Sequence, residues 1–332
     1  MEVVRRVTCR LLAVFLLFCC VLAEWNTQDY LKREHTLVKP YSGSGLAVPQ
    51  WDFVGTTMVT NNFVRLTSDH QSRQGAIWNT QPCMIKNWEL HVQFKVHGSG
   101  KNLFGDGFGI WYTKDRNQLG PVFGNKDFFT GMAILFDTYS NHNGPHNHEH
   151  PYVSAMINNG TLHYDHDRDG THTELAGCEA KFRNKDYDTY AAIRYQDNIL
   201  KVSLDTDGKN GWKECFVAHG VKLPIGYFFG ASAATGDLAD NHDIISLKLY
   251  ELDSITKKED SSDYRGLPSA DFFAAPRDHI EDPKGAFMSG GGWSGWKIFI
   301  IIVLSILGLA VCGVVGYVIF NKNSDYSRKR FY

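Results

Sequence analysis

The 332-residue sequence lacks helical periodicity between the apolar segments at its two ends. No stretch there repeats apolar residues at three- and four-residue spacing over a convincing length, and no internal repeat is visible. A basic stripe is also missing, because 34 lysines and arginines face 36 acidic residues, for a net charge of −2. We therefore do not expect nucleic acid as a partner.

Cysteine is scarce where it could form disulfides. Four of the seven cysteines lie in the apolar segments near the two ends, which leaves Cys83, Cys178 and Cys215. In an oxidising compartment these three can form at most one disulfide. We expect Cys178 to pair with Cys215, because each lies near the polar end of a strand-like run, and Cys83 to be a buried free thiol. Spacing alone leaves the other pairings open.

The first 23 residues have the organisation of a secretory signal peptide. Arg5, Arg6 and Arg10 precede an apolar core at residues 11–22, and small residues precede Glu24. We expect the mature chain to begin at Glu24; the alternative is a retained signal anchor.

An uninterrupted apolar run at residues 298–320 predicts a transmembrane helix. At about 1.5 Å per residue it reaches roughly 34 Å, which is enough to cross the hydrocarbon core. The basic residues of the tail at 321–332 predict that this tail is cytosolic. The sequence therefore predicts a single-pass type I membrane protein with a large lumenal part.

Strand-like alternation recurs at residues 90–96, 199–204 and 244–252. Shorter runs such as GIWYT and GMAILFDTY are apolar throughout, as in strands buried on both faces. Turn-forming sequences such as HGSGKN and DTDGKNG separate these segments. We predict an all-β jelly-roll sandwich over residues 24–252. Residues 253–297 are polar and contain Pro268, Pro276 and Pro283, which indicates a stalk.

Several acidic loops could meet at one edge of such a sandwich. Asp137, Tyr139 and Asn141 alternate in FDTYSN, and further aspartates occur in GDG (105–107), YDHDRDG (164–170) and TGDLAD (235–240). A shared ion requires the chain to curl just after Asp137. Bringing these charges together without a cation would be unfavourable, although each loop alone is more simply explained as a solvated turn. The sequence does not fit an EF-hand, because His142 and His148 replace the required Gly and Glu.

GDGFGIWYT, FDTYSN, YDHDRDG followed by TELAGC, and TGDLADNHDIISLKL, in this order, resemble the L-type animal lectins. The resemblance is closest to the vesicular integral-membrane lectins of the early secretory pathway. It implies a legume-lectin-like jelly roll, a cis Gly105–Asp106 peptide and one bound calcium ion. The implied calcium ligands are Asp137, Tyr139 (through its carbonyl), Asn141 and Asp169. The implied carbohydrate-binding residues are Ser72, Asp106, Asn141, His166, Gly236, Asp237 and Leu238.

Two features depart from the family pattern. Plant relatives carry a Glu where this chain has Leu135, which makes a second, transition-metal site doubtful. The loop NHNGPHNHEHPY holds His142, His146, His148 and His150. Either these histidines form a zinc site or they occupy an exposed variable loop, and we expect the exposed loop. We also expect Phe108 or Tyr139 to cover a sugar ring.

The sequence therefore predicts a calcium-dependent lectin for high-mannose N-glycans, a cargo receptor between the endoplasmic reticulum, the intermediate compartment and the Golgi. Mildly acidic pH or low calcium should release the glycan, because calcium ligands must be deprotonated and histidine titrates near pH 6.5. An alternative is a glycoside hydrolase using Asp106 and Asp169, although Glu is scarce in these loops. A module that binds only protein is a third class.

Asn159 is a glycosylation acceptor. The tail residues resembling sorting signals for vesicle coats are Arg328, Lys329, Arg330, Phe331 and Tyr332.

Overall fold

The computed structural model describes residues 30–41, 48–141, 149–254 and 266–270. These residues belong to one compact unit that ends at Pro276. They contain no α-helix. The elements are β1 Leu31–Leu37, β2 Trp51–Gly55, β3 Met58–Val59, β4 Val64–Thr67, β5 Gln74–Asn79, β6 Trp88–His97, β7 Gly107–Thr113, β8 Thr130–Asp137, β9 Tyr152–Asn159, a 3-10 helix His166–Arg168, β10 Ala176–Glu179, β11 Thr189–Gln196, β12 Ile199–Asp205, β13 Lys213–His219, β14 Phe228–Ala234 and β15 Asn241–Glu251.

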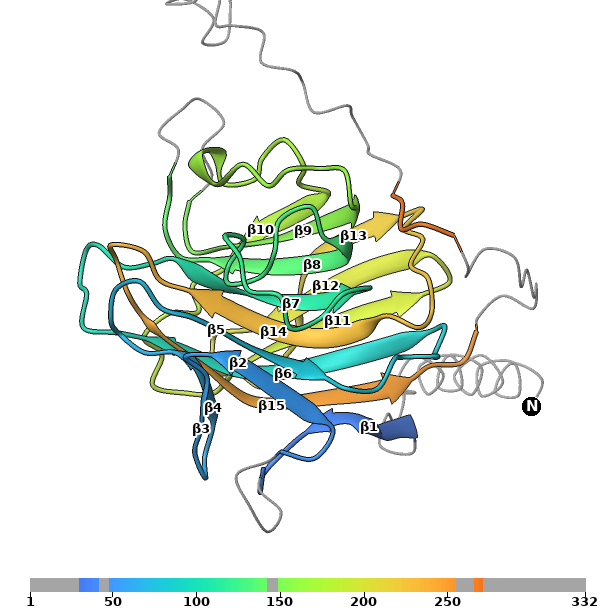
Figure 1. Cartoon of the computed structure of the whole chain (residues 1–332), viewed down its shortest axis with the longest axis horizontal. Helices are drawn as coiled ribbons and strands as arrows, with labels where there is room; N and C mark the ends of the chain where they lie inside the picture. The colour runs from blue at the N-terminus through green and yellow to red at the C-terminus, as the bar shows by residue number, and fades with distance from the viewer. Residues whose placement is uncertain (1–29, 42–47, 142–148, 255–265, 271–332) are drawn as a thin grey trace, which may run out of the picture. The chain divides into compact units, whose positions relative to one another are not determined.

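The strands form two antiparallel sheets (Figure 1). One has the order β13-β12-β11-β6-β15-β4-β3, with β1 also paired to β15, and the other has the order β10-β9-β8-β7-β14-β5-β2. Apolar side chains from both sheets form the main core. The prediction of an all-β sandwich is therefore confirmed.

Alternation marks the strands that have one face in this core. Along β6, Leu90, Val92 and Phe94 are buried, whereas Lys95 is exposed. The alternation at residues 244–252 is real but interrupted, because a bulge between Ile244 and Ser246 shifts the register of β15 against β6. The core-facing positions therefore change from Ile244 to Leu247 and Leu249 across the bulge, and the predicted alternation is not continuous.

The continuously apolar strands β7 and β8 are covered on both faces. Phe108 and Phe136 stack at a centroid distance of 4.4 Å in the main core. On the opposite face, Trp111 and Leu135 join a second apolar cluster that includes Phe129. Phe108 is only 1% exposed, so the expectation that it covers a sugar ring is wrong.

A disulfide joins Cys178 in β10 to Cys215 in β13, as predicted. These strands lie at the ends of the two sheets, so the bond links one sheet edge to the other. Cys83 is a buried free thiol, also as predicted.

A short segment of the predicted stalk packs against the sandwich. Ser269 and Lys222 exchange main-chain hydrogen bonds of 2.7 and 3.1 Å, and Pro268 is buried. In Figure 1 this segment, residues 266–270, lies near β13. The compact unit therefore extends beyond the predicted boundary at residue 252.

The other predictions for the two ends lie outside the described residues. These are the signal peptide at 1–23, the rest of the stalk, the membrane helix at 298–320 and the tail at 321–332. In the part of the chain that is described, no helix is long and apolar enough to cross a membrane.

Candidate functional site

Strand register brings the predicted site segments to one end of the seven-stranded sheet. Gly107, the first residue of β7, lies opposite Asp137 in β8 and opposite Ala234 in β14. Asp106 therefore sits between the ends of two neighbouring strands. The Gly105–Asp106 peptide is cis, as predicted. The Asp106 carbonyl accepts hydrogen bonds from the Thr138 N–H at 2.9 Å and from the Thr138 hydroxyl at 2.8 Å.

The Asp106 carboxylate is half-buried beside Gly236. A Cβ built on Gly236 would fall 3.2 Å from Oδ2 and 3.4 Å from Oδ1 of Asp106. Burial raises the pKa of Asp106; nearby His166 opposes this shift and Asp237 adds to it. The carboxylate is therefore partly withdrawn from water, next to a residue with no side chain. This leaves room for a polar ligand at the carboxylate.

The loop after β14 is tied to the loop before β5. The Ser72 N–H donates to the Gly236 carbonyl at 3.0 Å, and Gln71 Nε2 donates to the Asp237 carbonyl at 2.6 Å. On the other side, Leu238 lies close to Gly105, whose added Cβ would be 3.5 Å from that of Leu238. The predicted rim residues Gly236, Asp237 and Leu238 thus lie close to Asp106 or its neighbour Gly105, and Ser72 is bonded to this loop.

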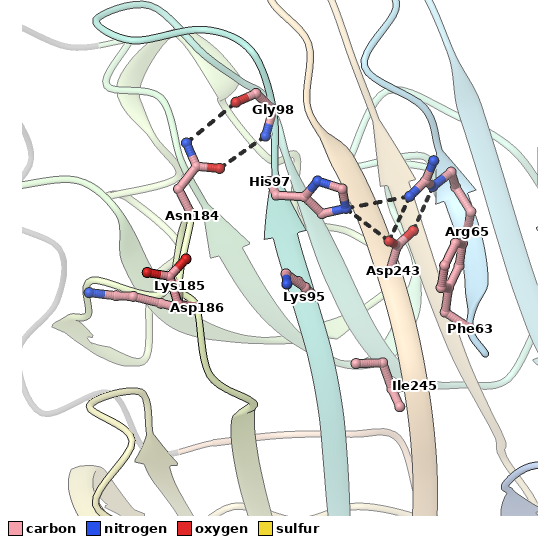
Figure 2. A pocket seen from close by; sticks show the side chains of 10 residues that line it. All are labelled: Phe63, Arg65, Lys95, His97, Gly98, Asn184, Lys185, Asp186, Asp243 and Ile245. Carbon is pink, nitrogen blue, oxygen red and sulfur yellow. Dashed lines mark hydrogen bonds and ion pairs between the residues drawn. The ribbon is translucent and has the colours of Figure 1, made fainter.

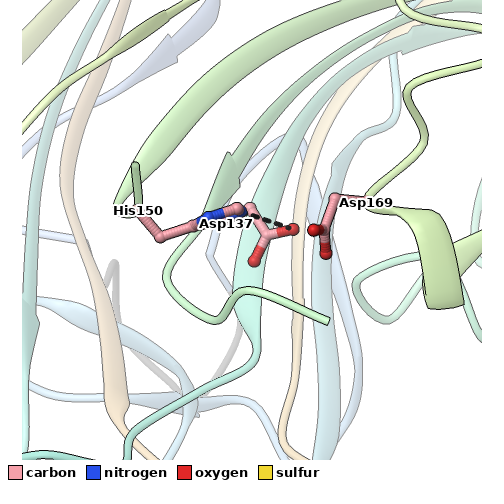
Figure 3. Close-up of side chains that lie close together, drawn as sticks. All are labelled: Asp137, His150 and Asp169. Carbon is pink, nitrogen blue, oxygen red and sulfur yellow. Dashed lines mark ion pairs between the residues drawn. The ribbon is translucent and has the colours of Figure 1, made fainter. Parts of the chain in front are cut away.

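A potential cation site lies close to Asp106. Asp137, His150 and Asp169 each offer one ligand atom, and these three atoms lie within 4.8 Å of one another. In Figure 3 their side chains point toward a common centre. His150 Nε2 is 3.8 Å from Asp137 Oδ2. Asp169 reaches the group because it follows the 3-10 helix in a left-handed conformation, with φ of 51°.

The chemistry of this group fits a cation. Asp137 Oδ1 accepts the Tyr139 N–H at 3.0 Å, but Oδ2 is buried without a hydrogen bond from any described residue. Burial raises the pKa of Asp137 well above its usual range, and the nearby Asp169 and Asp106 charges raise it further. A buried carboxylate beside two others is costly unless a cation neutralises it. A divalent ion held by Asp137 and Asp169 would supply that charge.

Tyr139 and Asn141, the other predicted ligands, follow Asp137 into the same corner. The Tyr139 N–H bonds back to Asp137, so the chain does curl just after this residue, as required for a shared ion. The Asn141 N–H donates to Asp169 Oδ1 at 2.9 Å. These contacts bring both segments together, and a metal role for the Tyr139 carbonyl and the Asn141 side chain stays a prediction.

His166 lies on the same side of the site as Asp106. Its ring packs against Phe123 and Tyr164, at centroid distances of 5.2 and 5.7 Å. Its Nδ1 is buried and makes no hydrogen bond with the described residues. His166 therefore has a buried polar atom that no described residue satisfies.

The expectation of an exposed histidine loop is wrong for His150. Its side chain is 5% exposed and faces Asp137. The register explains this placement: Tyr152 lies opposite Asp137 in the pairing of β9 with β8. A residue that precedes the neighbouring strand must lie close to the end of β8. The number and spacing of the histidines in the loop do not predict this placement, because it depends on how β9 pairs with β8. His142, His146 and His148 lie outside the described residues.

Two other features lie away from this site. A cavity of about 590 Å³ is lined by residues of β4, β6, β15 and the loop 184–186, among them Arg65, His97 and Asp243 (Figure 2). Asn159 is exposed at the end of β9, where its Oδ1 accepts the Thr161 hydroxyl at 2.6 Å. Asn159 is therefore accessible, and its glycosylation stays a prediction.

The fold is an antiparallel two-sheet sandwich, and the acidic group that could hold a cation lies close to a half-buried aspartate. This combination defines a protein of the legume-lectin type. The sequence model of the legume-like lectin family matches residues 28–259, and the chain belongs to this family.

Among proteins, the vesicular integral-membrane protein VIP36 of Homo sapiens is 53% identical over 311 residues, covering 92% of this chain and 86% of that protein. The VIP36-like protein of Mus musculus is 49% identical over 308 residues, covering 92% of this chain and 86% of that protein. Among solved structures, the VIP36 exoplasmic/lumenal domain in its Ca2+/Man3GlcNAc-bound form is 54% identical. It has a TM-score of 0.68 and covers 73% of this chain and 100% of its own.

Proposed function

We propose that this protein is a calcium-dependent lectin that binds high-mannose N-glycans on glycoprotein cargo. The observation that carries the proposal is the Asp106 carboxylate, half-buried beside Gly236 and close to the Asp137–Asp169 pair. The relative whose lumenal domain was crystallised with Ca2+ and Man3GlcNAc supports it.

The cation would organise the loops of the site. Asp137 and Asp169 would hold it with the Tyr139 carbonyl and the Asn141 side chain, since calcium prefers six to eight oxygen ligands. The mutual repulsion of Asp137, Asp169 and Asp106 would then be neutralised. Because Asn141 is proposed to contact both the ion and the sugar, this residue would couple calcium binding to sugar binding.

Sugar hydroxyls need directional acceptors and donors. We assign Asp106 as the main acceptor, with Asn141 and His166 beside it. Ser72 and the loop Gly236, Asp237 and Leu238 form the rim, where main-chain groups face the ligand. Tyr139 is half-buried and remains the candidate for covering a ring face. Such shallow sites bind with micromolar to millimolar constants, about −4 to −8 kcal/mol.

We further propose that the protein acts in the membranes of the early secretory pathway as a single-pass receptor for glycoprotein transport. The relatives named as vesicular integral-membrane proteins support this role. The tail residues 328–332 would then contact vesicle coats or sorting machinery. Removing Phe331 and Tyr332 should change the steady-state compartment; an unchanged location would mean that the basic residues only orient the chain.

The test of the lectin proposal is a glycan array with the full-length protein in detergent, with calcium, with EDTA, and with the Asp106→Asn variant. We expect binding of mannose-terminated glycans only with calcium and the native Asp106. Binding that persists in EDTA and after glycan removal would instead indicate a module for protein contacts. Release of free sugar from a mannose oligosaccharide would indicate a hydrolase.

A further inference from the structure

Arg183 contacts two of the segments that form the proposed carbohydrate site. Its guanidinium donates to Asp240 in a bidentate pair, with Nε–Oδ2 and Nη2–Oδ1 distances of 2.7 Å. The same guanidinium lies over the ring of Phe104, 3.9 Å from its centroid. The pair is almost fully buried, with Arg183 7% and Asp240 0% exposed.

The positions of the two partners in the chain give this contact its importance. Phe104 precedes Asp106 by two residues, and Asp240 follows Leu238 by two residues. One planar cation therefore links the segment that carries Asp106 to the loop that carries Gly236. The edge of the guanidinium binds the carboxylate and its face covers the ring, which the point charge of a lysine cannot do at once.

Neighbouring contacts fix the start of the segment that carries Asp106, at Gly98 and Ser99. The Asn184 side chain accepts the Gly98 N–H at 3.1 Å and donates to the Gly98 carbonyl at 3.4 Å (Figure 2). A Cβ on Gly98 would fall 2.1 Å from Asp240 Oδ1. Asp69 accepts both the N–H and the hydroxyl of Ser99 at 2.8 Å. The segment 98–106 is thus fixed by Asn184 and Asp69 at its start and by Arg183 at Phe104.

We propose that Arg183 is a positioning residue of the carbohydrate site, which sets the distance between the Asp106 carboxylate and the loop 236–238. This inference rests on the proposed lectin function. Arg183 binds no sugar itself. It has no contact with Asp137 or Asp169, so it acts on sugar binding and not on calcium binding.

The test replaces Arg183 by Lys. The substitution keeps the positive charge but removes the bidentate hydrogen bonds to Asp240 and the planar group that covers the Phe104 ring. We expect mannose affinity to fall about tenfold, a loss of about 1.4 kcal/mol, and calcium affinity to change less than about twofold. Arg65→Lys is the matched control. Arg65 also forms a bidentate pair, with Asp243 at 2.7 and 2.8 Å, and lies over Phe63 at 4.7 Å (Figure 2). That pair has no contact with the site, so mannose affinity should be unchanged.

Unchanged mannose affinity in Arg183→Lys overturns the inference. Equal losses of calcium and mannose affinity also overturn it, because they indicate a general structural role. If Arg183→Lys does not fold, Phe104→Leu and Phe104→Tyr replace it. The tyrosine keeps a ring below the guanidinium and should retain affinity, whereas the leucine should lose it; equal affinities overturn the inference.

A readout without sugar separates this inference from the lectin proposal. In Arg183→Lys, amide hydrogen exchange should accelerate at residues 98–106 and 235–240. It should not accelerate at 168–170, where the main-chain N–H groups bond within their own loop. Failure of the wild type to bind mannose would refute the lectin function alone, and the exchange result would still decide whether Arg183 positions these segments.

Discussion

Gly236 and the Asp106 carboxylate lie so close that a methyl group on the glycine would be 3.2 Å from Oδ2. That separation is shorter than an ordinary van der Waals contact, so a side chain at residue 236 must displace the carboxylate or occupy the space of its ligand.

Gly236→Ala should therefore weaken mannose binding about tenfold, a loss of about 1.4 kcal/mol, and leave calcium binding intact. Isothermal titration with mannose and separately with calcium measures both. Gly211→Ala is the control, because a Cβ there has no heavy atom within 4 Å. Equal mannose affinities for the two variants would remove Gly236 from the site.

Calcium should stabilise the fold through Asp137. At 100 times the dissociation constant a ligand adds about 2.7 kcal/mol to the free energy of unfolding, and Asp137→Asn should abolish this gain. Because burial raises the pKa of Asp137, the charged form is unfavourable in the calcium-free protein. The variant should consequently be at least as stable as the wild type in EDTA. Denaturant unfolding with and without calcium measures both effects, and a gain that survives the substitution contradicts the assignment.

His150 tests which metal the site prefers. Calcium favours oxygen ligands, whereas an imidazole favours transition metals. His150→Ala should therefore change calcium affinity less than about threefold, in contrast to Asp169→Asn, which removes an oxygen ligand. Calcium titrations of the two variants decide this, and a larger loss in His150→Ala than in Asp169→Asn would make the imidazole a primary ligand.

His242 should make the fold sensitive to acid. Burial lowers the pKa of His242 to about 3; the Asp243 charge opposes this shift, and His97 and Arg183 add to it. The unfolded state binds the proton near pH 6.5, so stability is present above that pH and is lost as pH falls. Relative to His242→Asn, the wild type should lose about 2 kcal/mol between pH 7.5 and 5.0. Urea unfolding of both proteins across this pH range measures the difference. Equal slopes of the free energy of unfolding against pH would contradict the prediction.

Removing the disulfide should destabilise the sandwich strongly. The bond closes a loop with a sequence separation of 37 residues, for which the chain-entropy model gives about 4 kcal/mol. Cys215→Ser should show this loss in denaturant unfolding. Cys83→Ser tests a different effect, the burial of a hydroxyl, and should leave the disulfide intact.

Local patterns in the sequence were enough to predict the strands and the main site segments. Alternation in β6 and continuous apolarity in β7 each reflect how many faces of a strand are buried. The acidic loops also converge as expected, because Asp137 and Asp169 lie together.

Contacts that depend on register or on distant loops could not be read from local patterns. His150 faces Asp137 only because β9 pairs with β8 in one register. Asp240 has the sequence context of a solvated turn, yet Arg183, 57 residues away, buries it. Phe108 precedes the apolar GIWYT run and points into the core, because the side chains of a strand alternate between its faces.

The pairing of Ser269 with Lys222 determines where tension would enter the sandwich. Lys222 precedes β14, and Phe228 and Ala234 lie at opposite ends of that strand. Six steps of about 3.3 Å separate these ends by roughly 20 Å, and only the Ala234 end adjoins Asp106. A pull on the chain beyond Ala270 would therefore load the pole remote from Asp106. The first contacts to bear that load would be the two main-chain hydrogen bonds between Ser269 and Lys222.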